Sequence, residues 1–117
     1  LGTALFALLI GYAVAAEMLL TGEDLTAQRA YELGLVNHVV PDGQALSKAR
    51  EIAQRIARNG PLAVKGILAT LRETEAMPEA DAFTIEMKHG GKVMQSKDAG
   101  EGPRAFLEKR DPVFTGE

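Results

Sequence analysis

Residues 1–22 read LGTALFALLIGYAVAAEMLLTG, and this stretch decides which class of fold the sequence can adopt. Its first charged side chain is Glu17, so the stretch could be a membrane span, a secretion signal or a helix buried in a globular protein. Sixteen residues of helix rise about 24 Å, which is less than the ~30 Å hydrocarbon core of a bilayer. The length of the uncharged run therefore argues against a membrane span.

A secretion signal is the second reading, because Ala13, Val14 and Ala15 resemble a small-residue cleavage site. The stretch lacks the basic n-region and the initiator Met of a signal peptide. Its apolar pattern also continues through the supposed cleavage point as AAEMLLTG and ends at Thr21 and Gly22, where Gly can adopt the left-handed conformation of a helix end. We therefore predict one buried helix that enters from the middle of a domain.

The composition is that of a globular helical protein. Of its 117 residues, 46% are hydrophobic, 25% are charged and only 5% are aromatic, which favours closely packed helices over a sheet. The net charge of −3 gives no reason to expect a nucleic-acid partner. The chain has no Cys, which excludes disulfides and permits a reducing compartment, so we expect a cytoplasmic protein.

The remaining sequence predicts short helices between clear stop signals, with at most one short strand near Leu35–Val40. Gly90 and Gly91 should weaken one of these helices and mark a kink or a close approach of two backbones. The predicted helices are 26–34 with Thr26 as N-cap, 45–58, one starting at Pro61, one starting at Pro78, and one capped by Ser96 with Asp98 in its first turn.

The residues alone indicate no reaction. His38 and His89 have no neighbouring His, Cys or spaced carboxylates that would make a metal site, so we interpret both as surface or structural side chains. Ser47 and Ser96 have no base near them in sequence, and Glu17 is expected at a helix end, reaching solvent or an Arg. A mild excess of Lys and Arg between residues 88 and 110 is typical of a solvated face.

Three stretches, taken together, resemble the enoyl-CoA hydratase/isomerase (crotonase) family. They are AAEMLLTGEDLTAQRAYELGLVNHVVP at 15–41, AREIAQRIARNGPLAVKGI at 49–67 and KDAGEGPRAFLEKRDPVFTGE at 97–117. The similarity is collinear over essentially the whole chain. It departs from the family pattern in LGTALFALLIG, where Leu5 and Leu8 occupy positions at which Arg is common.

The resemblance implies a fold and a division of the chain. The chain would be mainly α and form the C-terminal helical part of a crotonase-like α/β fold built on a ββα spiral. Residues 1–60 would end the crotonase core, and residues 61–117 would form the helical region for oligomerisation and for covering coenzyme A (CoA). The family's oxyanion-hole amides and acidic catalytic residues come from the preceding core, so no catalytic residue is expected in this chain.

The resemblance also implies a binding role for Phe106 and Lys109, which match the Phe and Lys of the family's A-F-x-E-K run near the nucleotide end of CoA. An aromatic ring can pack against a ring surface, and an ammonium group suits a phosphate. The alternative is that Phe106 only anchors helix packing and Lys109 is a solvated cation.

The activity implied is reversible hydration of 2-trans-enoyl-CoA through an oxyanion-stabilised enolate, with the CoA thioester as substrate and no separate cofactor or metal. Double-bond isomerisation is the family alternative, and a non-catalytic helical module that oligomerises and binds CoA is the alternative from another class. The resemblance implies a homotrimer or hexamer, with no nucleic-acid or membrane partner. This chain alone is expected to be inactive.

Overall fold

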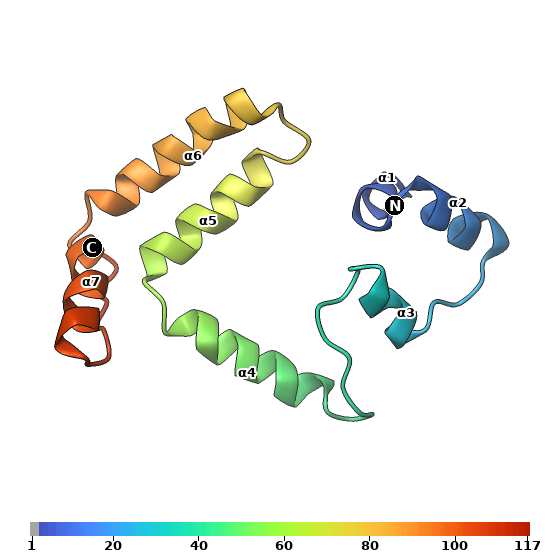
Figure 1. The fold of residues 1–117 in the computed structure, drawn as a ribbon, viewed down its shortest axis with the longest axis horizontal. Helices are drawn as coiled ribbons and strands as arrows, with labels where there is room; N and C mark the ends of the chain where they lie inside the picture. Colours follow the sequence, from blue (N-terminus) through green and yellow to red (C-terminus); the bar gives the residue numbers. More distant parts are fainter. Residues whose placement is uncertain (1–2) are drawn as a thin grey trace. The chain divides into compact units, whose positions relative to one another are not determined.

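The computed structural model describes the backbone of residues 3–117 and the side chains of residues 6, 7 and 9–117. Within this range the chain forms seven α-helices and no strand (Figure 1), which confirms the predicted helical fold. The side chains of Leu5 and Leu8 lie outside the described set. The chain divides into two compact units, Leu1–Ala49 and Arg50–Glu117.

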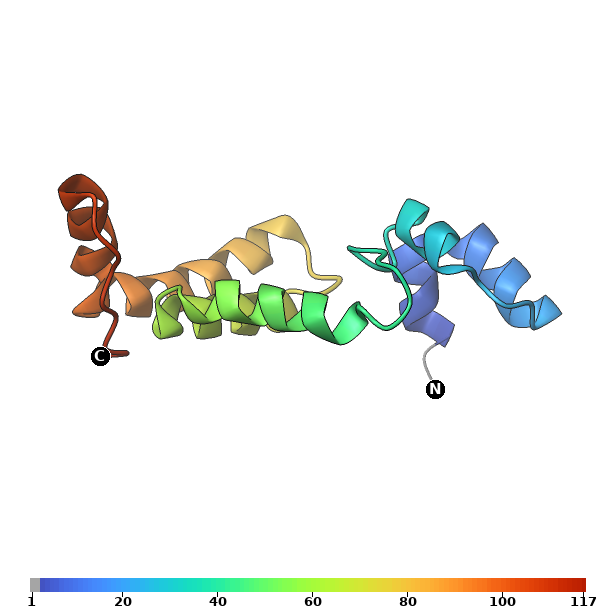
Figure 2. The same cartoon turned by 90° about the horizontal axis from the view of Figure 1, so that it is seen from below.

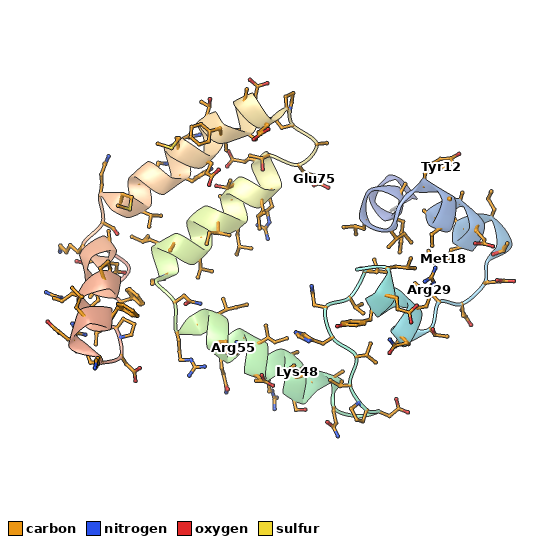
Figure 3. The ribbon with its side chains drawn as sticks, in the orientation of Figure 1. Tyr12, Met18, Arg29, Lys48, Arg55 and Glu75 are labelled. Carbon is orange, nitrogen blue, oxygen red and sulfur yellow. The ribbon has the colours of Figure 1, made fainter. Side chains whose placement is uncertain are left out.

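The predicted single opening helix is wrong, because two helices stand in its place. Helices α1 (Thr3–Ile10) and α2 (Tyr12–Thr21) meet at Gly11, whose φ of 83° interrupts the helix. The predicted burial holds for Ile10 and Ala15 but not along the whole stretch, since Tyr12 is 81% exposed and projects from the start of α2 (Figure 3). No helix of the described range is long and apolar enough to cross a membrane.

Helix α3 (Ala27–Glu32) begins and ends as its sequence predicts. The Oγ1 atom of Thr26 accepts a hydrogen bond of 3.1 Å from the backbone N–H of Arg29, which is an N-cap. At the other end Gly34 has a φ of 76°, and Leu35 donates its backbone N–H to the Ala30 carbonyl at 2.9 Å. The following residues 35–40 form no strand.

Helix α4 (Ala45–Ala57) covers the predicted helix 45–58 except for its last residue, and the two units divide within it. Asn59 ends the helix by donating its side-chain Nδ2 to the Arg55 carbonyl at 3.1 Å. Pro61 then opens α5 (Pro61–Glu73), as predicted, because a missing N–H costs nothing in the first turn. Of the large apolar side chains of α4, Leu46 and Ile56 are exposed and Ile52 is half-buried.

Helices α5 and α6 (Glu79–Met94) form an antiparallel pair, joined by a loop that contains Glu75 (Figures 2 and 3). The predicted kink or close approach at Gly90 and Gly91 is wrong. Helix α6 runs unbroken through both, and a Cβ atom added to either would meet no atom within 4 Å. The close approach lies at Gly66, where an added Cβ would be 3.2 Å from Cγ2 of Val93.

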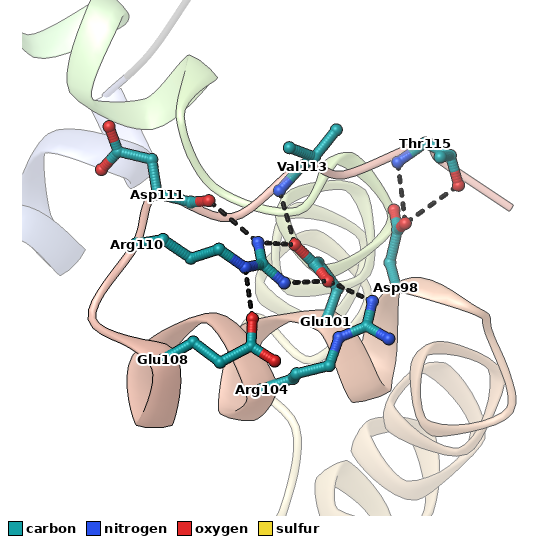
Figure 4. A network of polar contacts seen from close by, with 8 residues as sticks. All are labelled: Asp98, Glu101, Arg104, Glu108, Arg110, Asp111, Val113 and Thr115. Carbon is teal, nitrogen blue, oxygen red and sulfur yellow. Dashed lines mark hydrogen bonds and ion pairs between the residues drawn. The ribbon is translucent and has the colours of Figure 1, made fainter.

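Helix α7 (Asp98–Glu108) is not capped by Ser96 as predicted. Ser96 instead donates its hydroxyl to the Val93 carbonyl at 2.6 Å, at the end of α6. Lys97 precedes α7 and its side chain forms no cap hydrogen bond. The backbone then turns back at Lys109, so that residues 111–117 lie along α7 (Figures 1 and 4).

Candidate functional site

The two residues singled out by the family resemblance lie at the end of α7. Phe106 is in the last turn of the helix with 82% of its surface exposed, and Lys109 is exposed directly after the helix. Their side chains are thus accessible within this chain, and the backbone joins them, since Lys109 donates its N–H to the Phe106 carbonyl at 3.2 Å.

The turn that carries Lys109 is a Schellman motif. Lys109 adopts the left-handed conformation (φ 53°, ψ 40°), and the next residue, Arg110, donates its N–H back to the Ala105 carbonyl at 3.1 Å. This pair of hydrogen bonds satisfies carbonyl groups that the helix end would leave unpaired. Lys109 therefore has a defined backbone conformation.

A buried carboxylate stabilises this turn from within the helix. Glu101, whose side chain is only 7% exposed, accepts hydrogen bonds on both oxygens from Arg110, at 2.6 Å (Nη1 to Oε1) and 3.1 Å (Nη2 to Oε2) (Figure 4). Arg104 donates to Oε2 at 2.5 Å, and the backbone N–H of Val113 donates to Oε1 at 2.8 Å. One carboxylate thus joins the helix, the turn and the returning tail.

Asp98 holds the end of the tail in the same way. Its Oδ1 accepts the backbone N–H and the hydroxyl of Thr115 at 2.8 and 3.0 Å, and its Oδ2 accepts the backbone N–H of Gly116 at 2.7 Å. Lys97 adds an ion pair of 2.7 Å from Nζ to Glu117 Oε2. The tail is therefore fastened to the first turn of α7 as well as to Glu101.

These contacts shift the ionisation of the groups that make them. The pKa of Glu101 lies far below its ordinary value, chiefly because Arg110 and then the Val113 N–H stabilise the charged form. The pKa of Asp98 is also lowered, first by the N–H of Thr115, against an opposing effect of burial. The pKa of Arg110 is raised by the hydrogen bonds to Glu101 and Glu108. All three groups are therefore charged at neutral pH.

Apolar contacts join the tail to the start of α5. A Cβ atom placed on the buried Gly60 would lie 3.5 Å from the Phe114 ring, which is an ordinary van der Waals distance, so the ring packs directly against this part of the backbone. A Cβ atom on Gly116 would lie 3.3 Å from Cγ of Pro61. The tail thus connects α7 to the turn between α4 and α5.

The other candidates from the sequence do not come together in a site. His89 pairs with Glu73 at 2.9 Å between Nε2 and Oε1, whereas His38 and Glu17 are exposed. Ser47 donates its hydroxyl to the Gln44 carbonyl at 2.8 Å. In the described part of the chain, no group of three or more His, Cys, Asp or Glu side chains is arranged to hold a metal ion.

A groove of about 510 Å³ runs between α5 and α6. Its lining is mostly apolar and includes Ile67, Leu71, Val93 and Met94, with Glu86 as the charged contribution. Neither Phe106 nor Lys109 lines this groove.

A comparison with protein-family models matches residues 1–117 to the enoyl-CoA hydratase/isomerase family. The chain belongs to this family. Among characterised sequences it is similar to the enoyl-CoA hydratase EchA19 of Mycobacterium tuberculosis, with 59% identity over 105 residues that cover 90% of this chain and 40% of that protein. It is also similar to carnitinyl-CoA dehydratase of Salmonella paratyphi A, with 39% identity over 89% of this chain and 41% of that protein.

Solved structures of enoyl-CoA hydratases are similar to nearly the whole of this chain. The crystal structure of enoyl-CoA hydratase from Bacillus anthracis matches with a TM-score of 0.94 and 39% identity, covering 99% of this chain and 45% of that one. The chain thus spans less than half the length of these relatives and corresponds to their C-terminal helical part. This confirms the family and the fold implied by the sequence.

The sequence reasoning missed the polar network beneath Lys109. It treated Asp98 as a favourable charge in a first helical turn and assigned Glu101 and Arg110 no role. The available signal was the placement of two acidic residues in the first turn of the helix and an Arg after its end. The pairing of Glu101 with Arg110, nine residues later, depends on the left-handed turn between them.

Proposed function

We propose that this chain supplies contacts for the nucleotide end of CoA in an acyl-CoA enzyme that resembles enoyl-CoA hydratase. The observation that carries the proposal is the exposed pair at the end of α7, Phe106 and Lys109, on a turn of defined conformation. The role of the pair comes from the family resemblance, and its accessibility supports it.

The chemistry of the two side chains suits this ligand. An exposed ammonium group can donate up to three hydrogen bonds to phosphate oxygens, and charge-assisted bonds of this kind are among the stronger ones. An exposed aromatic ring next to it can pack against the adenine ring or the apolar part of the ligand. Phe106 has the exposed area for such a contact, because it does not serve as a core residue in this chain.

The names of the relatives support contacts to the CoA portion rather than to the acyl group. One is an enoyl-CoA hydratase and another a carnitinyl-CoA dehydratase, so their substrates share CoA and differ in the acyl part. A helix end that binds the shared portion is compatible with both. We therefore assign CoA thioesters as the ligand class.

The reaction proposed for the complete catalytic unit is reversible hydration of a 2-trans-enoyl-CoA, and double-bond isomerisation is the alternative within the family. Both would proceed through a thioester enolate stabilised by backbone N–H donors. Hydration also requires carboxylates that activate water and transfer the α-proton. By the family resemblance these groups belong to the preceding core, so the 117-residue chain alone should not hydrate crotonyl-CoA.

A second candidate function is a non-catalytic helical module that oligomerises and binds CoA. It is favoured by the apolar side chains exposed on the helices, which need a partner surface; they include Leu46, Ile56, Ile67, Leu71, Phe83 and Met87. A homotrimer or hexamer would cover such faces. Sedimentation equilibrium of the purified chain tests this candidate. An oligomer would support it, and a monomer would argue against it.

The experiment that tests the proposal is a calorimetric titration of the chain with CoA and, separately, with pantetheine, which lacks the nucleotide. Saturable binding of CoA with much weaker binding of pantetheine is expected. Equal affinity for the two ligands, or no binding of CoA, would refute a nucleotide contact. A crotonyl-CoA hydration assay on the same sample, after its intact mass is verified, should show no turnover; robust turnover would refute the assignment of the catalytic groups.

A further inference from the structure

The turn after α7 contains an unusual residue for its conformation. Helix α3 ends in the same type of turn, with Leu35 bonded back to Ala30 and Gly34 in the left-handed position at a φ of 76°. Helix α7 places Lys109 in that position at a φ of 53°. Glycine is preferred there, because a Cβ atom disfavours the left-handed conformation. A lysine at this position must be held by its surroundings.

The surroundings that hold it are the residues on either side. Arg110 directs its guanidinium back across the turn, where Nε contacts Glu108 Oε2 at 2.5 Å and the two terminal nitrogens contact Glu101 (Figure 4). The same guanidinium donates to the Asp111 carbonyl at 3.1 Å. Lys109 therefore lies between two residues that are bonded to each other, one of which is bonded to a buried carboxylate.

This arrangement fixes the backbone under an exposed side chain. The Lys109 side chain starts from a backbone whose φ and ψ the network restricts, one turn beyond Phe106. A group that is already ordered loses less conformational entropy when it binds a ligand. The polar network thus has a consequence for binding in addition to its effect on stability.

We propose that Glu101 and Arg110 are positioning residues for CoA, which hold Lys109 in the backbone conformation from which its side chain binds the nucleotide phosphates. The inference rests on the proposed function, since it needs Lys109 as the phosphate contact. It goes beyond that function by assigning binding affinity to an ion pair that does not touch the ligand.

A role in stability alone makes a different prediction. If Glu101 and Arg110 only fasten the helix end, their removal would lower the melting temperature and leave the affinity of the folded protein for CoA unchanged. If they position Lys109, their removal weakens binding only while Lys109 is present. The dependence on Lys109 is the readout that separates the two roles.

The test is a calorimetric titration with CoA of the full chain and of its Arg110→Gln, Lys109→Ala and doubly substituted variants, below their melting temperatures. Lys109→Ala should weaken binding about tenfold, which is the effect of losing a charged hydrogen bond. Arg110→Gln should weaken it roughly fivefold by loss of ordering. The double variant should bind no more weakly than Lys109→Ala alone. Arg110→Lys, which retains the charge, should fall between wild type and Arg110→Gln.

The control is Lys97→Gln, which removes the 2.7 Å ion pair with Glu117 at the opposite end of the helix. It should retain wild-type affinity. Wild-type affinity in Arg110→Gln, together with weakened binding in Lys109→Ala, would overturn this inference and leave the proposed function intact. Wild-type affinity in Lys109→Ala, or no binding by the wild type, would overturn both.

Arg110→Lys decides the matter if Arg110→Gln does not fold, because it keeps a cation beside Glu101 but lacks the planar fork that bonds both carboxylate oxygens. We expect Arg110→Lys to be folded and to bind CoA roughly twofold more weakly than wild type. Unchanged affinity in this folded variant would overturn the inference.

Discussion

Arg110 donates to both carboxylate oxygens of Glu101, at 2.6 and 3.1 Å. The residue that follows the left-handed turn at Lys109 is therefore bonded to a residue near the start of α7. Bidentate pairs of this kind fix geometry as well as contributing energy. Glu101 also accepts a hydrogen bond from the Val113 N–H, so the same carboxylate holds the C-terminal tail against α7. The proposed CoA contacts and the fold of the tail thus depend on one buried group.

The first prediction concerns acid stability. The pKa values of Glu101 and Asp98 are lowered in the folded chain from ordinary values of 4.5 and 3.8. The unfolded chain therefore binds more protons in acid, so the free energy of unfolding should be constant above about pH 5.5 and decrease as the pH falls further. Urea unfolding at a series of pH values measures this.

The variant Glu101→Gln supplies the control for that series. It removes the group with the larger lowering of pKa, so it should be less stable than wild type at pH 7 and should lose less stability on acidification. The comparison rests on the low pKa of Glu101 in the folded chain. If the free energies of unfolding of the two proteins decreased in parallel below pH 6, Glu101 would not be the group responsible.

The second prediction concerns Lys109→Gly, which should change stability and binding in opposite directions. Glycine relieves the strain of the left-handed conformation, which stabilises the folded chain, but it also adds backbone entropy to the unfolded chain. The net effect should raise the free energy of unfolding by about 0.5–1 kcal/mol. Loss of the ammonium group should weaken CoA binding. Urea unfolding and CoA titration provide the two measurements.

The matched control for this variant is Gly34→Lys, which creates the same residue in the equivalent turn of α3. It should lower the free energy of unfolding by about 1 kcal/mol. A loss of stability in Lys109→Gly would mean that the Lys109 side chain contributes more to the fold than its exposure suggests.

The third prediction distinguishes two glycines in the pair α5 and α6. Gly66→Val should be destabilised by about 1–3 kcal/mol, because its side chain would meet Val93 at a distance that is already short for a Cβ atom. Gly90→Ala should be stabilised by about 0.5–1 kcal/mol, because a Cβ atom meets nothing there and alanine favours the helix. Thermal unfolding of both variants checks the pair, and the reverse order of stability would contradict the packing.

The fourth prediction concerns the aromatic rings of the tail and of α7. Phe114→Ala should lower the free energy of unfolding by about 2 kcal/mol, which is less than for a fully buried ring because Phe114 is half-buried. Phe106→Ala should change it by less than about 0.5 kcal/mol, since the ring is exposed. Equal losses in the two variants would show that the tail does not pack as described.

The helix layout could largely be predicted because its signals are local. Thr26, Gly34 and Pro61 each act through the backbone of the next few residues, and all three mark the expected boundaries. Gly11 carried the same kind of signal, but the uncharged run around it favoured a single continuous helix. At Ser96 two local choices competed, and the hydroxyl bonded to the end of α6 instead of starting α7.

The site could be predicted only in part. Phe106 and Lys109 follow from the resemblance to a family motif, which needs no knowledge of contacts. The pairing of Glu101 with Arg110 and that of Asp98 with Thr115 join residues nine and 17 positions apart across a reversal of the chain. No periodicity of a helix or strand connects such positions. Only the folded tail brings them together.

The most direct test of the central claim compares the affinity for CoA of the wild-type chain with that of Lys109→Ala and Lys88→Ala, each titrated by calorimetry at the same ionic strength. Both lysines are exposed, and only Lys109 lies at the proposed site. The account predicts a dissociation constant about tenfold higher for Lys109→Ala and unchanged for Lys88→Ala. Equal dissociation constants for the three proteins would contradict the claim that the end of α7 binds CoA.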